Sequence, residues 1–364
     1  MKINNKHYTA IWQKPDNNQI IQIIDQTKLP FSFEIKNLTS VNDIYIAIKD
    51  MEVRGAPLIG ITAAFGMYLA CIEASRSDSF NEHLQSNADK LRNSRPTAVN
   101  LFHAIDTMLK EIEKENDISK KINTALNTAQ KYFNKEIENF KLIGEIGLPL
   151  IENISRKKKE KTVNILTHCN AGWIACGDYG TATSPIYHAF DKGINIHVWV
   201  SETRPRNQGS RLTAWELGMH GIPYTIIADN TSGYIMQNDL VDIVIVGSDR
   251  TAKNGDVTNK IGTYLKALAA KDNNIPFYVA LPKSTIDTNI KSGHEIEIEQ
   301  RNADEIKYIE GILNNKIEKV LLTPKNANAV NYAFDITPAK LITGLITENG
   351  ICEANKNSIE KLFD

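Results

Sequence analysis

The stretch that decides the fold is VNILTHCNAGW, residues 163–173. A short run of β-branched and aliphatic residues ends at His168, and a polar cluster carrying the thiol of Cys169 follows it. The next segment, up to Tyr187, contains glycine and is predicted to be helical, which is how a parallel strand passes into a helix. Open α/β sheets bind ligands at the carboxyl edge of such strands. The sequence therefore predicts a parallel sheet with Cys169 at its ligand-binding edge.

Strand-like segments then alternate with segments of helical length, which predicts a mainly parallel sheet with right-handed crossovers. The chain before residue 150 is mostly helical, with apolar residues spaced three and four apart, after a small β element in the first 50 residues. We predict a mainly helical N-terminal domain, residues 1–150, and a Rossmann-like α/β domain, residues 151–364. The predicted helices of the first domain span residues 40–51, 57–74, 98–113 and 118–154, and the predicted strands of the second span residues 162–168, 195–200, 224–228, 241–246, 277–281 and 319–322.

The composition limits the kinds of partner. The 364 residues suit two domains, and 42 Lys and Arg against 43 Asp and Glu give no general attraction to nucleic acid or membrane. We therefore expect a small-molecule partner or another copy of the chain. The basic run at residues 156–161 is interpreted as a solvated helix end rather than a nucleic-acid patch, because it stands alone.

The four cysteines are scattered, with no spacing typical of a disulfide framework or a zinc site. The N-terminus lacks the apolar core of a signal peptide, so we expect a reducing cytoplasm. The apolar segment at residues 57–71 is shorter than a bilayer span and contains glycine, so it is interpreted as a buried helix with a close packing seam.

Two residues at predicted strand ends are candidates for catalysis. Cys169 could be a buried small hydrophobe, but a position before a helix N-terminus would favour a thiolate that acts as base or nucleophile. Asp249 follows the β-branched run at residues 241–246, and could instead cap a turn or pair with Arg250. In a site that excludes water its pKa would rise, and it could then act as an acid. His168 points to the opposite strand face and is interpreted as structural.

Two further stretches are typical of phosphate binding. Arg54 and Gly55 precede the buried helix, where free amides and a guanidinium could hold a phosphate while glycine lets a ligand approach the backbone. The same reasoning applies to Asn259 and Lys260, at the start of another predicted helix. Arg95 adds another arginine at a helix start.

The loop ETRPRNQG, residues 202–209, follows another strand and could bind sugar hydroxyls through Gln208. Glu202 could instead hold an NAD ribose, but the turn after residue 168 lacks the G-x-G-x-x-G fingerprint and no Walker motif is present. The phosphate is therefore expected to belong to the substrate rather than to a nucleotide.

Together these stretches resemble the methylthioribose-1-phosphate isomerase family, which is related to the regulatory subunits of translation initiation factor 2B. The resemblance covers residues 50 to 348. It rests on VRGAP (53–57), RPTAVNL (95–101), THCNAG (167–172), ETRP (202–205), LTAWEL (212–217), NGDV (254–257), NKIGTY (259–264), IPFYVA (275–280) and FDITP (334–338).

The resemblance implies a dimeric enzyme without a cofactor or metal that converts an aldose 1-phosphate to a ketose 1-phosphate in methionine salvage. It also implies that Cys169 and Asp249 are the catalytic pair. The substrate-binding residues that it implies are Arg54, Gly55, Ala56, Arg95, Gln208, Asn259 and Lys260.

Several alternatives stay open at this point. Cys169 could remove the C2 proton while Asp249 opens the ring, or a hydride could move from C2 to C1 without that base. Trp173 and Ser248 replace smaller residues frequent in the family, so 5-deoxyribose 1-phosphate is a second candidate substrate. A ribose 1,5-bisphosphate isomerase would need another cationic cluster, which is not evident in the sequence. The rival from another class is a non-catalytic regulatory protein like the initiation-factor subunits.

Overall fold

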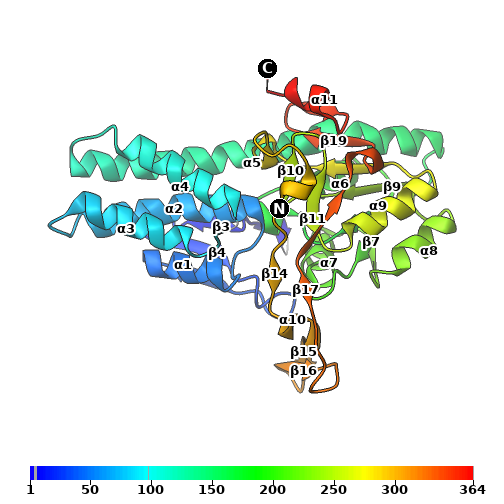
Figure 1. Cartoon of the computed structure of the whole chain (residues 1–364), viewed down its shortest axis with the longest axis horizontal. Helices are drawn as coiled ribbons and strands as arrows, with labels where there is room; N and C mark the ends of the chain where they lie inside the picture. Colours follow the sequence, from blue (N-terminus) through cyan, green and yellow to red (C-terminus); the bar gives the residue numbers. More distant parts are fainter. Residues whose placement is uncertain (4–5, 97, 364) are drawn as a thin grey trace. The chain divides into compact units, whose positions relative to one another are not determined.

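The computed structural model describes residues 1–3, 6–96 and 98–363 (Figure 1). Tertiary contacts divide the chain into two compact units that interleave along the sequence. The N-terminal unit consists mainly of residues 6–139 and 173–180, and the C-terminal unit of residues 140–172 and 181–363. Helix α5 (Ile118–Lys157) contributes to both units, so the predicted domain boundary at residue 150 falls inside one helix and stays a prediction.

The N-terminal unit is built around helix α2, which is apolar on every side and is buried accordingly. Gly66 makes the predicted packing seam, because a Cβ there would lie 2.8 Å from Ile44 and 3.1 Å from Leu91. Among the described residues α2 is long and apolar enough to cross a membrane, yet most of it is buried as a core helix. The unit contains β2 (Lys6–His7), an antiparallel sheet of β3 (Ile11–Gln13), β4 (Ile21–Ile24) and β5 (Ile35–Leu38), and helices α1 (Val41–Lys49), α2 (Ala56–Ala74), α3 (Phe80–Arg92) and α4 (Val99–Ile112).

The C-terminal unit contains the predicted parallel sheet, in the order β20-β19-β12-β9-β6-β7-β8. Only β20 pairs antiparallel, at the edge. Leu166, Val244 and Val279 belong to the core of this unit, as expected for strands covered on both faces. The strands are β6 (Val163–His168), β7 (Ile196–Ser201), β8 (Tyr224–Ile227), β9 (Ile243–Val246), β12 (Phe277–Ala280), β19 (Gly344–Thr347) and β20 (Gly350–Cys352). The predicted fold class is confirmed.

Short helices connect these strands: α6 (Ser184–Asp191), a π-helical turn η2 (Gly209–Thr213) that leads into α7 (Ala214–His220), α8 (Thr231–Gln237), α9 (Thr263–Asp272) and, after the sheet, α11 (Lys356–Glu360). The 3₁₀ turns are η1 (Trp173–Ala175), η3 (Lys283–Thr285), η4 (Gly293–Glu295) and η5 (Ala339–Leu341). The basic run lies at the end of α5, as interpreted, and Lys158 pairs with Asp242 at 2.6 Å.

A second sheet follows β9, in the order β13-β10-β11-β18, and is mostly antiparallel. Its strands are β13 (Ile286–Asp287), β10 (Arg250–Ala252), β11 (Val257–Lys260) and β18 (Phe334–Thr337). The remaining strand is β1 (Lys2–Ile3).

Residues 300–332 form an arm that projects from the C-terminal unit (Figure 1). One predicted strand, residues 319–322, was expected in the parallel sheet but lies mostly in this arm's antiparallel hairpin, where strand β16 is exposed along its whole length. The sixth parallel strand is β19 instead, which pairs with β12 and has all four residues buried. The arm contains β14 (Gln300–Arg301), α10 (Asp304–Lys307), β15 (Tyr308–Leu313), β16 (Lys316–Leu321) and β17 (Asn331–Tyr332).

Candidate active site

Cys169 and Asp249 lie at the point where the strand order of the parallel sheet reverses. From β6 the chain adds β7 and β8 on one side, then returns to add β9, β12 and β19 on the other. Cys169 follows β6 and Asp249 follows its neighbour β9. The two turns also touch, since a Cβ at Gly247 would lie 2.6 Å from the Cβ of Ala171. Ligands of such sheets bind outside this reversal point, so the two predicted catalytic residues share one ligand-binding edge.

Two threonine hydroxyls hold the backbone of Cys169. The Cys169 amide donates to Thr203 Oγ1 at 2.9 Å, and Thr213 Oγ1 donates to the Cys169 carbonyl at 2.6 Å. Cys169 has φ +65°, a left-handed conformation that costs a residue other than glycine about 1–3 kcal/mol. The backbone of this half-buried residue is therefore held on both sides of its α-carbon, which fixes the direction of its Cα–Cβ bond.

The prediction that a helix begins directly after Cys169 is wrong. The chain passes through η1 and several turns, and helix α6 begins only at Ser184. Gly177 and Gly180 take positive φ values of +97° and +85° between these elements, which interrupts any helix. No helix dipole therefore acts on Cys169 from a helix that begins directly after it. The two threonine hydrogen bonds hold the Cys169 backbone instead.

Asp249 lies in the turn between β9 and β10. Its backbone amide donates to the Thr258 carbonyl at 3.0 Å, which ties the turn to β11. The neighbouring Arg250 guanidinium lies 3.8 Å from the Asp287 carboxylate. The alternative of an ion pair between Asp249 and Arg250 is therefore not favoured. Asp249 is exposed. The exclusion of water that would raise its pKa therefore requires a bound ligand to cover the carboxyl.

A polar cluster beneath Cys169 was not anticipated from sequence. His168 and Lys266 are almost completely buried, and the carboxylate of Asp229 lies 3.8 Å from His168 Nδ1 and 3.9 Å from Lys266 Nζ. Burial lowers the pKa of His168 to about 3 and that of Lys266 to about 8. Burial alone would raise the pKa of Asp229, but the Ser201 hydrogen bond and the Lys266 charge hold it below its usual value.

The sequence did contain a signal for this cluster. Asp229 follows β8 as Asp249 follows β9, so it is a strand-end aspartate on the same edge of the sheet. At neutral pH His168 is uncharged because of its burial, which agrees with its interpretation as a structural residue.

Gln208 is well placed to bind a polar ligand. It is 7% exposed, and its Oε1 atom has no hydrogen-bond partner among the described residues. A buried amide oxygen without a partner is unfavourable, so it favours a ligand that donates a hydrogen bond. The next residue must be glycine, because a Cβ at Gly209 would lie 1.8 Å from the Ser201 carbonyl oxygen.

Asn259 and Lys260 were predicted to lie at a helix start. They lie in strand β11 instead, just before helix α9. β11 is fixed between β10 and β18, and this pairing overrides the local signal. Lys260 is 4% exposed, donates to the Ala333 carbonyl at 2.6 Å and lies 4.4 Å from the ring centre of Phe334.

The helix that does begin here, α9, already holds an anion. The amides of Gly262 and Tyr264 donate to the Asp335 carboxylate at 2.7 and 3.1 Å. Burial nevertheless raises the pKa of Asp335 to about 6. The predicted phosphate cradle at this helix start is therefore occupied by a carboxylate of the same chain.

The N-terminal unit brings the two predicted arginines to one end of a helix pair. Arg54 precedes α2 and Arg95 precedes α4, and these helices pack against each other. A Cβ at Gly60 would lie 3.0 Å from the Asn100 carbonyl oxygen, so the N-terminal parts of both helices are adjacent. Both positive helix ends and both arginines thus lie at the same end of the pair, as an anion site requires. Thr97, which follows Arg95 in the predicted motif, lies outside the described residues.

Glycine at position 55 also has a packing reason that the sequence did not reveal. Gly55 has φ +97°, and a Cβ there would lie 2.5 Å from the Ala175 carbonyl oxygen. The space on the Cβ side of its α-carbon is therefore filled by the chain's own backbone. Ala56 begins α2 and Pro57 lies in its first turn, as predicted.

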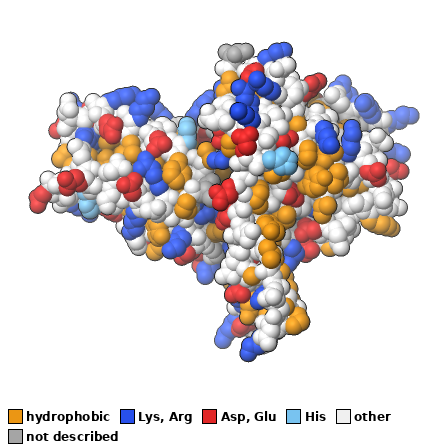
Figure 2. All heavy atoms as spheres, in the orientation of Figure 1, with side chains coloured by type: hydrophobic (Ala, Val, Ile, Leu, Met, Phe, Trp, Pro, Cys, Tyr) orange, Lys and Arg blue, Asp and Glu red, His pale blue; other side chains and the backbone are white. Residues whose placement is uncertain are grey.

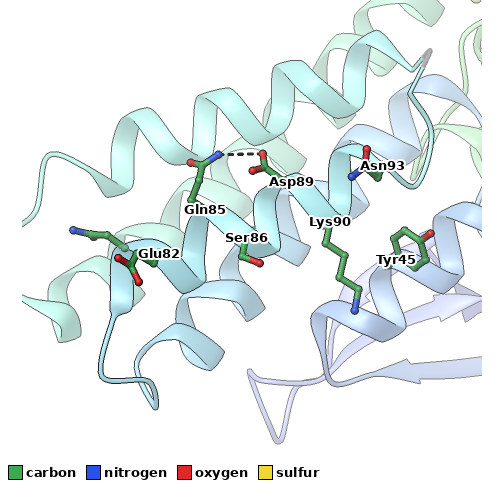
Figure 3. Close-up of a pocket in the computed structure, with 8 residues that line it drawn as sticks. Tyr45, Glu82, Gln85, Ser86, Asp89, Lys90 and Asn93 are labelled. Carbon is green, nitrogen blue, oxygen red and sulfur yellow. Dashed lines mark hydrogen bonds between the residues drawn. The ribbon is translucent and has the colours of Figure 1, made fainter.

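The N-terminal unit also contains an open groove that includes none of the predicted site residues. It has a volume of about 1010 Å³ and is lined by α1 and α3 (Figure 3). Its polar side chains are of mixed charge, and Gln85 donates to Asp89 at 3.1 Å. Within residues 1–3, 6–96 and 98–363 no three His, Cys, Asp or Glu side chains are grouped to hold a metal ion.

Comparison with known proteins places the chain in a family. Residues 52–354 match the initiation factor 2 subunit family. A protein of Desulfatibacillum aliphaticivorans named methylthioribose-1-phosphate isomerase is 54% identical over 364 residues, which cover all of this chain and 99% of that protein.

Two solved structures are similar over nearly the whole chain. The crystal structure of 5-methylthioribose 1-phosphate isomerase from Pyrococcus horikoshii OT3 has a TM-score of 0.86 at 35% identity, covering 98% of this chain and 96% of that one. The structure titled translation initiation factor eIF-2B, subunit delta, from A. fulgidus has a TM-score of 0.82 at 38% identity, covering 98% and 100%. The chain therefore belongs to the initiation factor 2 subunit family, and within it to the methylthioribose-1-phosphate isomerase family that its motifs indicate.

Proposed function

We propose that the protein is an aldose-ketose isomerase that converts S-methyl-5-thio-α-D-ribose 1-phosphate to S-methyl-5-thio-D-ribulose 1-phosphate, a step of methionine salvage. The observation that carries this proposal is the 54% identity, over the full length, to a protein named methylthioribose-1-phosphate isomerase. The reversal point of the sheet supports it, because it brings a thiol and a carboxyl group to one edge.

The phosphate of such a substrate poses a specific chemical problem. An ordinary aldose opens to an aldehyde, whose neighbouring C–H bond is acidic enough for a base to remove the proton. A phosphate on the anomeric oxygen blocks that opening. The enzyme must therefore break the bond between C1 and the ring oxygen while the phosphate stays attached to C1.

We assign Asp249 as the acid and Cys169 as the base. Asp249 would give a proton to the ring oxygen as its bond to C1 breaks, and the Cys169 thiolate would take the C2 proton. The resulting enol has a double bond between C1 and C2. Return of a proton to C1 and loss of the C2 hydroxyl proton then give the ketone. Asp249 is exposed without ligand, so its acid role requires the sugar to cover it.

The remaining predicted residues are proposed to bind the substrate. Arg54 and Arg95, with the first turns of α2 and α4, would hold the phosphate, and Gly55 and Ala56 would offer backbone groups there. Gln208 would accept a hydrogen bond from a sugar hydroxyl, as its unsatisfied buried oxygen favours. Asn259 and Lys260 are buried strand residues, and their proposed roles rest on the family resemblance alone.

The direct test is a kinetic assay of purified wild type, Cys169→Ser and Asp249→Asn. We expect each variant to lose about 100-fold or more in kcat, the usual contribution of a positioned acid or base. Both S-methyl-5-thioribose 1-phosphate and 5-deoxyribose 1-phosphate should be assayed side by side. An apolar pocket separates such substituents by only about 1–3 kcal/mol, so activity on both is expected. The hydroxyl of Ser248, which departs from the family pattern, forms a hydrogen bond with the Thr251 hydroxyl at 3.0 Å.

An isotope experiment separates the two reaction routes. Proton transfer through Cys169 predicts solvent deuterium at C1 of the product when the reaction runs in deuterated water. A hydride shift from C2 to C1 predicts none, because the migrating hydrogen never leaves the substrate. Loss of activity in Cys169→Ser without deuterium incorporation would indicate a shielded proton or a different role for the thiol.

A second candidate function is favoured by one comparison. The solved structure titled as an initiation factor subunit is about as similar to this chain as the solved isomerase is. If wild type and both variants were equally inert on both sugar phosphates, a regulatory binding role would replace the isomerase proposal. Retention of Cys169 and Asp249 at the reversal point supports the enzyme.

We also propose that the protein is a cytoplasmic homodimer. Figure 2 shows hydrophobic side chains along the arm. Ile312 and Ile317 are paired across its hairpin and are 52% and 42% exposed, and Val330 and Tyr332 at its base are 61% and 50% exposed. An apolar surface of this kind is typical of an interface between chains. Light scattering of wild type and Ile312→Asp tests it: a monomeric wild type would contradict the proposal.

A further inference from the structure

The hydroxyl of Thr203 connects the candidate base to the next strand of the sheet. Thr203 is fully buried in the turn after β7, and its Oγ1 accepts the Cys169 amide at 2.9 Å. The same oxygen donates to the Ser201 carbonyl at 2.9 Å and lies 3.3 Å from His168 Nδ1. The position of the Cys169 backbone therefore depends on where the Thr203 side chain is held.

Thr203 itself has a conformation that needs support. Its φ is +67°, in the left-handed region that a β-branched residue rarely adopts. Cys169 has φ +65°, so two non-glycine residues with this unfavourable conformation meet at one hydrogen bond. Such residues persist only where surrounding contacts fix them, and they concentrate at functional sites.

The contacts that fix Thr203 come from Asp229. Its carboxylate accepts the amides of Thr203 at 2.8 Å and Arg204 at 2.7 Å, and also the Ser201 hydroxyl. Three donors from one turn therefore converge on one carboxylate. An ionised carboxylate is needed here, because all three partners donate.

The surroundings of Asp229 keep its carboxylate ionised and in place. Lys266, from α9, is 2% exposed, donates to the Asp229 carbonyl at 3.4 Å and lies 3.9 Å from its carboxylate. His168, from β6, faces it at 3.8 Å. The guanidinium of Arg204 donates to the carbonyls of Pro205 and Ile306. The buried lysine is thus the cation that balances Asp229.

We propose that Asp229 and Thr203 are positioning residues for Cys169: Asp229 orients the Thr203 turn, and the Thr203 hydroxyl then sets the direction of the Cys169 thiol. This inference rests on the proposed function, because it requires Cys169 to act as the base. Neither residue needs to touch the substrate. Their removal should therefore slow proton transfer while leaving substrate binding nearly unchanged.

A matched pair of variants at Thr203 tests the hydroxyl. Thr203→Val keeps the shape and branching but removes the acceptor for the Cys169 amide, whereas Thr203→Ser keeps the acceptor. We expect Thr203→Val to lower kcat about 30- to 100-fold with KM changed less than about threefold, because a misplaced base mainly slows the chemical step. Thr203→Ser should stay within about threefold of wild type.

A second pair tests the carboxylate. In Asp229→Asn the amide NH₂ can only donate, so at least one of the three donors that Asp229 binds loses its acceptor. We expect kcat to fall about tenfold or more with little change in KM. Asp242→Asn is the control: Asp242 accepts the Asn164 amide at 2.7 Å and pairs with Lys158, but at the opposite end of β6. It should change Tm and leave kcat within about threefold of wild type.

The outcomes separate this inference from the proposed function. If Cys169→Ser is inactive while Thr203→Val and Asp229→Asn keep wild-type kcat, the positioning role is wrong and the isomerase stands. If Cys169→Ser keeps wild-type kcat, Cys169 is not the base and the inference fails with it. A purely structural role would lower Tm and leave kcat per folded molecule and its pH profile unchanged. If Thr203→Val does not fold, the Asp229 and Asp242 pair decides.

Discussion

Helices α2 and α9 begin alike and use their first turns differently. Each follows a glycine with a left-handed φ, Gly55 at +97° and Gly262 at +99°. The amides at the start of α9 are taken by the Asp335 carboxylate, whereas within the described residues no carboxylate accepts a hydrogen bond from the first amides of α2. A helix N-terminus attracts any anion, including one from its own chain. The start of α2 is therefore the better candidate for binding the substrate phosphate.

The largest expected effect on activity comes from removing the cation beside α2. Arg54→Ala should lower kcat/KM for the sugar phosphate about 100-fold or more, because a charge-assisted contact to phosphate is lost. Arg76→Ala is the matched control, since Arg76 is exposed just beyond the other end of α2. Steady-state kinetics test this: if kcat/KM of Arg54→Ala equalled that of Arg76→Ala, the start of α2 would not bind the phosphate.

The two glycines should differ in their tolerance of a side chain. Gly55→Ala adds a clash with the Ala175 carbonyl at 2.5 Å to the strain of a positive φ, so we expect a loss of about 3 kcal/mol or more. At Gly262 the nearest atoms are 3.3 Å away on the His168 ring, and we expect about 1–2 kcal/mol for Gly262→Ala. Urea denaturation measures both, and equal losses would contradict the assigned packing.

The carboxylate at the start of α9 should give stability a pH dependence. Burial raises the pKa of Asp335 from 3.8 to about 6, so between these values the folded protein binds more protons than the unfolded chain. Its contribution is therefore fully present below about pH 4 and is lost as the pH rises through about 6.

Comparison with Asp335→Asn isolates this effect. The difference in free energy of unfolding, wild type minus variant, should fall by about 2 kcal/mol between about pH 4.5 and 7.5. A difference that stayed constant, or rose, would show that the carboxyl is not shielded as its burial implies.

The smallest expected effect is the stabilisation given by inorganic phosphate. At about ten times its Kd, a ligand that binds only the folded state adds about 1.4 kcal/mol. Thermal denaturation should show this increase in wild type and in Asp335→Asn, but not in Arg54→Ala. If the stabilisation were lost in Asp335→Asn and kept in Arg54→Ala, we would conclude that phosphate binds at the start of α9 rather than α2.

The sequence alone determined the elements whose signals are local. The β-branched runs predicted β6 and β9, and the residues that follow them, Cys169 and Asp249, could be placed at the ligand-binding edge. The apolar run predicted α2 as a core helix. These signals are strong because a strand buried on both faces and a fully buried helix both require nearly continuous apolar residues. Helix α3 was missed because it buries only Leu84, Ala88 and Leu91.

Features that depend on partners distant in the chain could not be read from the sequence. Asn259 and Lys260 lie in a strand because β10 and β18 pair with β11. The carboxylate that accepts the first amides of α9 belongs to Asp335 of β18, far along the chain. The hydrogen bonds and ion pair that link Cys169 to Thr203, Thr203 to Asp229 and Asp229 to Lys266 likewise join separate elements. Local periodicity reports which face of an element is buried. It does not report which side chain will neutralise a charge or satisfy an amide, since that depends on contacts formed when the chain folds.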